Sequence, residues 1–329
     1  MTRQQTIVDV AQRADVSIAT VSRVLNDRPV ANVDMVRRVR VAAAELGYRP
    51  SGTARSLQSG KTKVVGVVVP DLANPSFSEL LRGLADGAAA HGHRVLVAGA
   101  KESPEEERNL VAELSLHADG LVLCSPRMPS SEIVELANRP VVCTNRAVDG
   151  YPLGSAVVDS AGGMATAVRH LAGHGHQHIG YLGGPPTSWS EQEQHRGLEE
   201  AAAEMGMQVA IETAGSAMAD GFRALPKLLD CGVTSVLAFN DLVAIGCFAR
   251  LRERSLTAPH DVSIVGFDDI PVAAFLDPAL TTIRVPTEDL GRQAWELLWG
   301  QLERDEEPRS VSLPTELVLR ASTGPPAGA

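Results

Sequence analysis

The chain of 329 residues lacks any long hydrophobic run. A helix needs about eighteen or more apolar residues in succession to cross a membrane, and no stretch of the sequence supplies them. The first residues are polar and lead directly into a helical pattern, so we expect no signal peptide. Both absences favour a cytoplasmic protein.

Cysteine is scarce, and the common catalytic motifs are missing. The four cysteines form no Cys-x-x-Cys pair, which argues against a disulfide framework or a zinc site, and we interpret them as free thiols. Neither Gly-x-Ser-x-Gly nor His-Glu-x-x-His occurs, and no nucleophile or general base stands out. We therefore expect no enzymatic activity, no metal and no cofactor. The cysteines are Cys124, Cys143, Cys231 and Cys247.

Charge is unevenly distributed along the chain. Residues 1–63 contain 11 Lys and Arg against five Asp and Glu, a net charge of +6. The whole chain carries −10, so residues 64–329 carry −16. A basic head on an acidic body is expected where only the head meets a polyanion, and DNA is the obvious candidate.

Two short helices joined by a tight turn are predicted within this basic segment, over residues 6–26. Thr6 and Asp9 form a start signal for the first helix, and Ser17 starts the second. A third helix is expected from a cap at Asn32 to Leu46, with Gly47 as its stop. The pattern suits either a plain helical hairpin or a DNA-binding helix-turn-helix, and the coinciding basic charge favours the second. The inward-facing apolar positions are Ile7, Val10, Ala11, Ala14, Val21, Val24 and Leu25.

From Val64 onward, apolar strands alternate with helices, which predicts parallel sheets covered on both faces. The number of strands suits two similar α/β lobes. Ligands bind beyond the carboxyl ends of strands in such folds. The expected strands are 64–69, 94–99, 120–124, 141–145, 179–184, 235–240 and 262–267, with helices that include 77–91, 161–173, 191–206 and 241–254.

The chain resembles the LacI/GalR family, the family of the lactose and galactose repressors, over nearly its whole length. The strings that carry the resemblance are IVDVAQRADVSIATVSRVLN, ELGYRPSGTARSL, NPSFSELLRGLADGAAAHG, HLAGHGHQHIGYLGG, FNDLVAIG, DVSIVGFDDIP and PALTTIRVPTEDLG. The resemblance implies an all-α helix-turn-helix headpiece joined to an α/β, two-lobed, periplasmic-binding-protein-like core with parallel sheets. It also implies a sequence-specific transcriptional regulator, and we expect a repressor of a catabolic, carbohydrate-type operon that is controlled by a small-molecule effector. A homodimer on a palindromic operator is expected, without a tetramer-forming helix because no leucine heptad follows residue 319.

The resemblance divides the chain into three segments. The headpiece is residues 1–48, the hinge helix or linker 49–62, and the effector-binding and dimerisation core 63–329. Within the core, an N-lobe is expected at about 63–158 plus 288–312. The C-lobe is expected at about 159–287 plus 313–323.

The DNA-binding residues follow from the matching motif positions. Arg23 can grip a guanine edge or a phosphate, and Ile18 can meet a thymine methyl group. Leu57 matches the leucine that the family wedges into the minor groove, although it could instead pack within a linker. The full set is Thr6, Ser17, Ile18, Ala19, Thr20, Ser22, Arg23, Asn26, Ala54, Arg55 and Leu57.

The effector-binding residues are expected in the cleft between the lobes. Turn or cap roles for Asn240 and Asp268, and core packing for Phe77, remain alternatives. Three positions depart from the family, because Gln194, Ser216 and Val285 replace an arginine, a frequent aromatic and a glutamine. The expected effector residues are Asp71, Asn74, Phe77, Asn145, Arg146, Asp159, Ser188, Trp189, Ser190, Gln194, Asn240 and Asp268.

Other functions fit the sequence less well. Residues 59–62, SGKT, mimic part of a phosphate-binding loop, but Arg55 stands where that loop needs glycine. His170, His174, His176 and His178 resemble a metal cluster but match a family segment, and no Cys or Glu nearby completes a site. The effector is expected to be a sugar or sugar derivative, with a non-sugar effector, or none, as the alternative. A solute-binding protein without a DNA function would share the core but has no use for the basic head.

Overall fold

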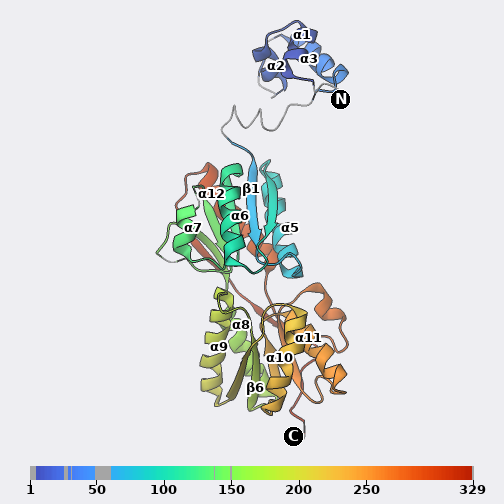
Figure 1. Ribbon diagram of the computed structural model, residues 1–329, viewed down its shortest axis with the longest axis vertical. Coiled ribbons are helices and arrows are strands. Elements are labelled where there is room, and N and C mark those ends of the chain that lie inside the picture. The colour runs from blue at the N-terminus through green and yellow to red at the C-terminus, as the bar shows by residue number, and fades with distance from the viewer. Residues whose placement is uncertain are drawn as a thin grey trace. The chain divides into compact units, whose positions relative to one another are not determined.

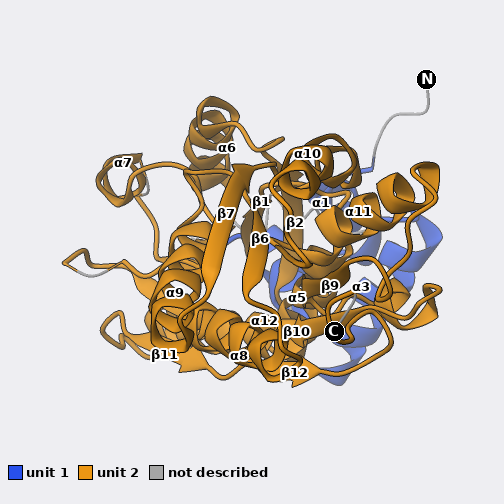
Figure 2. Ribbon diagram, turned by 90° about the horizontal axis from the view of Figure 1, so that it is seen from below, with its two compact units in different colours: residues 1–62 blue, residues 63–329 orange. Residues whose placement is uncertain are grey.

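The computed structural model describes residues 5–25, 29–30, 32–48, 61–136, 138–148 and 150–327. These residues divide into two compact units, 1–62 and 63–329, which Figure 2 distinguishes by colour. The smaller unit is helical, and the larger is an α/β unit with two sheets. This architecture confirms the predicted fold class.

The described residues of the smaller unit form three helices, α1 (Ile7–Ala14), α2 (Ile18–Leu25) and α3 (Val33–Glu45). Thr6 caps α1 reciprocally, because its backbone N–H donates to Asp9 while its hydroxyl accepts the Asp9 backbone N–H. Asn32 caps α3 by accepting the Met35 N–H. Val10, Val21 and Val39, one from each helix, are completely buried and form the centre of a small core.

The N-lobe of the larger unit contains a six-stranded parallel sheet in the order β11-β5-β4-β3-β1-β2. Helices α5 (Pro75–Ala90) and α12 (Thr287–Glu303) cover one face, and α6 (Pro104–His117) and α7 (Ser130–Leu136) cover the other. The strands are β1 (Val64–Val69), β2 (Arg94–Gly99), β3 (Gly120–Cys124), β4 (Val141–Thr144), β5 (Gly154–Val158) and β11 (Ser310–Leu313).

The C-lobe repeats this arrangement with the order β12-β10-β9-β8-β6-β7, in which only β12 is antiparallel among the described strands. Figure 1 shows its helices grouped around β6, apart from those of the N-lobe. The strands are β6 (His178–Gly183), β7 (Gln208–Thr213), β8 (Ser235–Ala238), β9 (Ser263–Asp268), β10 (Thr281–Arg284) and β12 (Glu316–Val318). The helices are α8 (Ser160–Gly173), α9 (Trp189–Met205), α10 (Met218–Asp230), α11 (Asp241–Glu253) and the short 3-10 helix η1 (Pro271–Phe275).

All seven predicted strands are present within two residues of the expected ends. The strands β5, β7, β10, β11 and β12 were not predicted. Three of them, β7, β11 and β12, lie at sheet edges and have partly exposed or exposed residues, so they lack the continuous apolar run of a central strand.

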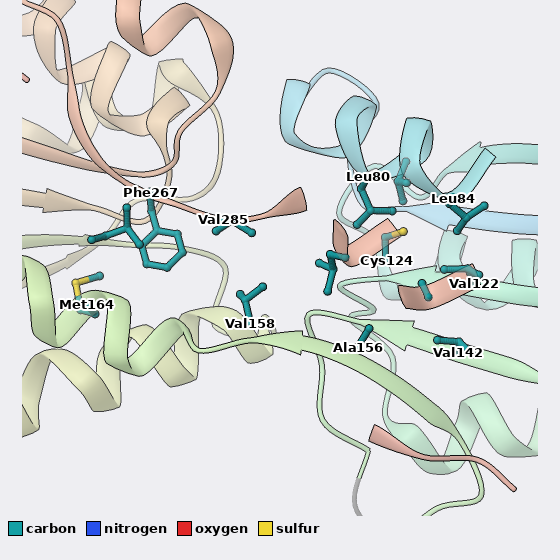
Figure 3. Close-up of a cluster of buried hydrophobic side chains, with 14 of the residues drawn as sticks. Leu80, Leu84, Val122, Cys124, Val142, Ala156, Val158, Met164, Phe267 and Val285 are labelled. Carbon is teal, nitrogen blue, oxygen red and sulfur yellow. The ribbon is translucent and has the colours of Figure 1, made fainter. Parts of the chain in front are cut away.

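One apolar cluster extends across both lobes at the level where the chain passes between them. The chain crosses after β5, after β10 and after β11. Figure 3 shows Val158 and Val285, which stand at the first two crossings, between the C-lobe residue Phe267 and the N-lobe residue Cys124. All four residues are buried. Val158, Val285, Phe267 and Cys124 therefore belong to a buried apolar layer between the lobes, which we call the apolar floor.

Candidate functional site

A cavity with a free volume of about 50 Å³ lies between the two lobes, above this apolar floor. Ten of the described lining residues are Asn, Gln or Ser, and only three carry an ionisable group, so the wall suits a polar but weakly charged ligand. The polar residues are Asn74, Ser76, Ser125, Asn145, Ser160, Ser188, Ser190, Gln194, Ser216 and Asn240. The ionisable residues are Glu102, Arg127 and Asp268, and the apolar ones are Phe77, Val158, Phe239, Phe267 and Val285.

Three of the polar residues stand between a strand and the helix that follows it. Asn74, Ser188 and Asn240 are the N-caps of α5, α9 and α11, where each side-chain oxygen accepts a backbone N–H. The cap fixes the direction of the side chain at the carboxyl end of the sheet. In Asn240 the amide nitrogen remains as a donor and bonds the Ser216 carbonyl at 2.9 Å. Asn240 therefore both caps α11 and lines the cavity.

Asp268 is the acidic residue of the C-lobe wall. Its backbone has a φ of 112°, a value that residues other than glycine rarely adopt. Burial, together with the nearby Asp241, raises the pKa of the Asp268 carboxyl well above its usual range. A hydrogen bond with the Asn74 side chain of the N-lobe opposes that shift. Asp268 therefore faces the cleft and contacts the opposite lobe.

Gln194 occupies the position where the family's arginine was expected. It is 2% exposed, and its Oε1 accepts a hydrogen bond from the Tyr181 hydroxyl at 3.2 Å. The same hydroxyl donates to Glu191 at 2.6 Å. Burial and the Glu191 charge raise the pKa of Tyr181, which stays protonated and remains a donor. On this wall the Tyr181 hydroxyl therefore lies between a neutral amide and one carboxylate, and the shorter contact is with the carboxylate.

Eight of the twelve predicted effector residues line the cavity, and four do not. Asp71 accepts the Ala73 N–H in a turn, and Asp159 caps α8. Arg146 donates to the carbonyls of Pro126 and Met128, which holds the loop after β3. Trp189 begins α9 but is not among the lining residues. These four residues are therefore not among those that line the cavity.

Sequence reasoning did not include Glu102, Ser125, Arg127 and Ser160 among the candidates. Arg127 and Ser125 follow β3, and Glu102 follows β2, so the rule that ligands bind beyond strand ends could have found them. Ser160 is the first residue of α8 and is 2% exposed, and its hydroxyl has no hydrogen-bond partner in the described chain. The further lining residues Ser76, Val158, Phe239 and Phe267 were also not predicted.

The candidate DNA-binding face is on α2. Ile18 is 49% exposed, and Ala19 and Arg23 are exposed beside it. The Ser17 hydroxyl accepts the Thr20 N–H at 3.1 Å, so it closes the first turn of the helix. Thr20 and Ser22 are half-buried, and Thr6 is exposed at the start of α1. Asn26, Ala54, Arg55 and Leu57 lie outside the described residues.

Three of the four histidines considered as a metal cluster, His170, His174 and His176, have ring nitrogens in contact with protein groups. His176 is buried, and its ring nitrogens contact Thr234 Oγ1 and the Gly324 carbonyl at 2.8 and 2.9 Å. His170 contacts Thr323 Oγ1 at 3.0 Å. Within the described ranges, no three His, Cys, Asp or Glu side chains form a group that could hold a metal ion. No helix there is long and apolar enough to cross a membrane.

Comparisons with known proteins match the N-terminal helical unit and the α/β core to two different families. Residues 6–51 match the family of bacterial regulatory proteins called lacI, and residues 168–323 match a periplasmic binding protein-like domain. The ribose operon repressor of Halalkalibacterium halodurans is 33% identical over 323 residues, which cover 97% of each chain. The lac repressor dimer bound to operator and the anti-inducer ONPF matches with a TM-score of 0.87 at 27% identity, covering 98% of this chain and all of that one.

A complex of the transcriptional regulator CelR with cellobiose also matches, with a TM-score of 0.74 at 28% identity over 97% of this chain and 99% of that one. These relatives are transcriptional regulators rather than enzymes. The headpiece and the two-lobed core both match known families, and the alignment with the ribose operon repressor covers 97% of each chain. The chain therefore belongs to the LacI family of bacterial regulatory proteins.

Proposed function

We propose that the protein is a cytoplasmic, homodimeric repressor that binds a palindromic operator of a carbohydrate operon and responds to an effector in the cleft. The observation that carries the proposal is the joint presence of a helix-turn-helix unit and a polar inter-lobe cavity in a chain that aligns with a ribose operon repressor over 97% of its length. A solute-binding protein without a DNA function would not need the first unit.

The surface of α2 supports DNA recognition. Small exposed side chains allow a helix to enter the major groove, and Ile18 offers an apolar contact for a thymine methyl group. Arg23, exposed in the last turn, is the donor that reads a guanine edge. Thr6 and the N–H groups at the helix starts contact phosphates and position the headpiece.

Exposed apolar residues support a dimer formed by the core. Leu96 and Val97 on the edge strand β2 are 48% and 37% exposed, and Phe275 in η1 is 86% exposed. Large apolar side chains at a sheet edge are costly in water and are usually covered by a partner. The solved relative described above is a dimer on its operator. Two headpieces held by one dimer would read two half-sites.

A sugar or sugar derivative is the effector that best suits the cleft. The lining is rich in neutral hydrogen-bonding groups, and Phe77 adds an aromatic face for the C–H groups of a sugar ring. An effector that prefers one closure of the lobes shifts the protein between its DNA-binding and released states by the difference in its two affinities. A non-sugar effector, or no effector, is the competing proposal, and the loss of an arginine at Gln194 is its support.

The test is an in vitro selection of genomic fragments by the purified full-length protein, followed by sequencing. An enriched palindrome supports the proposal, and its neighbouring genes nominate the effector. Absence of enrichment over bulk DNA at near-physiological salt contradicts specific repression without a bound ligand. Recovery of enrichment only after addition of a sugar would identify that sugar as a co-repressor.

A further inference from the structure

Arg127 is the single basic side chain among the described residues that line the cleft. Its side chain is only 5% exposed. It follows β3 in the N-lobe, whereas Gln194, at the position of the family's expected arginine, lies on α9 in the C-lobe. The cleft therefore has an arginine, but one that comes from the opposite lobe.

Contacts within the N-lobe fix the guanidinium of Arg127. Its Nε donates to Glu102 Oε2 at 2.7 Å, and its Nη1 donates to the Ser125 carbonyl at 2.7 Å. The backbone N–H donates to the buried Glu107 at 2.7 Å, which holds the loop. The second terminal nitrogen, Nη2, makes no hydrogen bond within the described part of the chain. A planar group held on two sides leaves this donor available at a defined position.

Glu102 places an acceptor beside that donor. Both Lys101 and Glu102 have a left-handed backbone, with φ of 53° and 56°, and this sharp turn after β2 directs Glu102 into the cleft. Oε2 accepts from Arg127, and Oε1 accepts from the Ser216 hydroxyl at 3.2 Å. Ser216 belongs to the C-lobe, so Glu102 also bridges the two lobes. A ligand hydroxyl can replace the serine as the donor.

The charge balance around Arg127 disfavours an anionic ligand. Glu102 neutralises the guanidinium directly, and Glu107 accepts two backbone N–H groups next to it. Asp268 adds a further acidic group to the wall. The side-chain oxygens Ser160 Oγ and Asn145 Oδ1 are buried and unpartnered in the described chain, and both residues line the cavity. Such a wall has hydrogen bonds to offer but no net positive charge for a phosphate.

We propose that Arg127 and Glu102 bind two neighbouring hydroxyl groups of an uncharged sugar or polyol, and that this matched pair discriminates against phosphorylated sugars. One hydroxyl accepts from Arg127 Nη2, and the adjacent hydroxyl donates to Glu102 Oε1. The inference deepens the proposed function and rests on it. The charged side chains that contact the ligand then come from the N-lobe and not from α9 of the C-lobe.

The test measures sugar binding to the full-length protein by isothermal titration, after a thermal-shift survey of five probes. These are D-ribose, D-galactose, cellobiose, ribose 5-phosphate and galactose 6-phosphate. At least one uncharged sugar should bind, with its phosphorylated form at least about tenfold weaker. Arg127→Gln and Glu102→Gln should each weaken that binding about tenfold to a hundredfold, the usual loss for a hydrogen bond to a charged group.

Arg108→Gln is the matched control. Arg108 donates to Glu132 within the same lobe, and neither residue lines the cleft, so its loss should leave sugar affinity unchanged. If Arg127→Gln does not fold, the Glu102→Gln variant alone tests the assignment of the pair. Glutamine keeps the shape of glutamate and its amide oxygen still accepts a hydrogen bond, so this variant should fold.

Each other outcome overturns a defined statement. Unchanged sugar affinity in both cleft variants overturns the assignment of the pair and leaves the proposed function intact. Tighter binding of a phosphorylated sugar overturns the selection for uncharged ligands. If none of the five probes binds the wild-type protein, the sugar-effector part of the proposed function fails, and this inference fails with it.

Discussion

The Thr282 hydroxyl donates a 2.6 Å hydrogen bond to Oδ1 of Asp241, and both residues are completely buried. The other carboxyl oxygen of Asp241 accepts the Ile270 N–H at 2.8 Å. Asp241 is the first residue of α11, and its charge helps to raise the pKa of Asp268 in the cleft wall. The buried acid thus joins α11, β10 and the segment after β9 directly behind the cleft.

Stability should depend on pH through Asp241. Burial raises the pKa of this carboxyl from 3.8 to about 7, so the folded protein holds a proton that the unfolded chain releases. A group whose folded pKa is raised in this way loses its contribution as pH rises from about 4 to about 7. Asparagine cannot ionise, so the free energy of unfolding of wild type relative to Asp241→Asn should fall by about 2 kcal/mol between pH 5 and pH 7.

Urea unfolding at the two pH values measures this difference. Burial lowers the pKa of His93, His170 and His176, which acts in the opposite direction, but both proteins contain these histidines and the comparison cancels them. Parallel pH profiles for the two proteins would show that Asp241 keeps an ordinary pKa in the folded state.

The elements could be predicted from sequence because caps and apolar runs are local signals. Thr6 and Asn32 start their helices as expected, and the central strands follow their hydrophobic runs. The edge strand β2 was found because its residues are mostly apolar, whereas the edge strand β7 was not, because polar residues shorten its apolar run. The place of β7 is determined by pairing with a neighbouring strand, which a local pattern does not encode.

The cleft was predictable only in part for a related reason. Asn74, Asn240 and Asp268 follow strand ends within recognisable motifs. Glu102 and Arg127 also follow strand ends, but their direction depends on left-handed backbone at Glu102 and Ser125, with φ of 56° and 44°. A single torsion at a residue other than glycine decides whether a side chain enters the cleft, and the residue types give no warning of it. For this reason the sequence placed Arg146, rather than Arg127, among the cleft residues.

Close packing of α10 on α11 should make Gly246 sensitive to substitution. A Cβ atom added there would lie 1.9 Å from the Met218 carbonyl oxygen on the neighbouring helix. Because the contact is with backbone, the helices must separate, and Gly246→Ala should lower the free energy of unfolding by about 1–3 kcal/mol. Gly173→Ala is the control, since a Cβ there meets nothing within 4 Å and alanine favours the helix. Chemical denaturation measures both, and equal stability of the two variants would contradict the close approach.

The four cysteines should differ sharply in reactivity. Burial raises the pKa of Cys124, Cys143 and Cys247 to about 12, whereas Cys231 is exposed. The thiolate is the reactive form, so the three buried thiols have almost none of it at pH 8 and are also shielded. A chromogenic disulfide reagent should release about one equivalent from the native protein and four after unfolding. Cys231→Ser should abolish the native signal, and a second fast thiol in wild type would mean that the core around one of the buried cysteines opens readily.

Arg23 should carry sequence discrimination rather than general affinity. It is exposed on the face of α2 that also presents Ile18 and Ala19, and neither of these can donate a hydrogen bond to a base. Arg23→Ala should therefore weaken binding to the selected operator by about 1–3 kcal/mol while changing binding to a scrambled duplex much less. Fluorescence anisotropy at several salt concentrations separates the two effects, because a lost phosphate contact reduces the salt dependence on both duplexes.

Arg37→Ala provides the matched control for charge. Arg37 lies on α3, is 76% exposed and pairs with Asp34, so its removal changes the headpiece charge by the same amount away from α2. Its affinity for the operator should fall no more than its affinity for the scrambled duplex. If Arg23→Ala behaves in the same way, with equal losses on both duplexes, Arg23 contacts a phosphate, and base recognition must come from Ile18 and from the shape of the DNA.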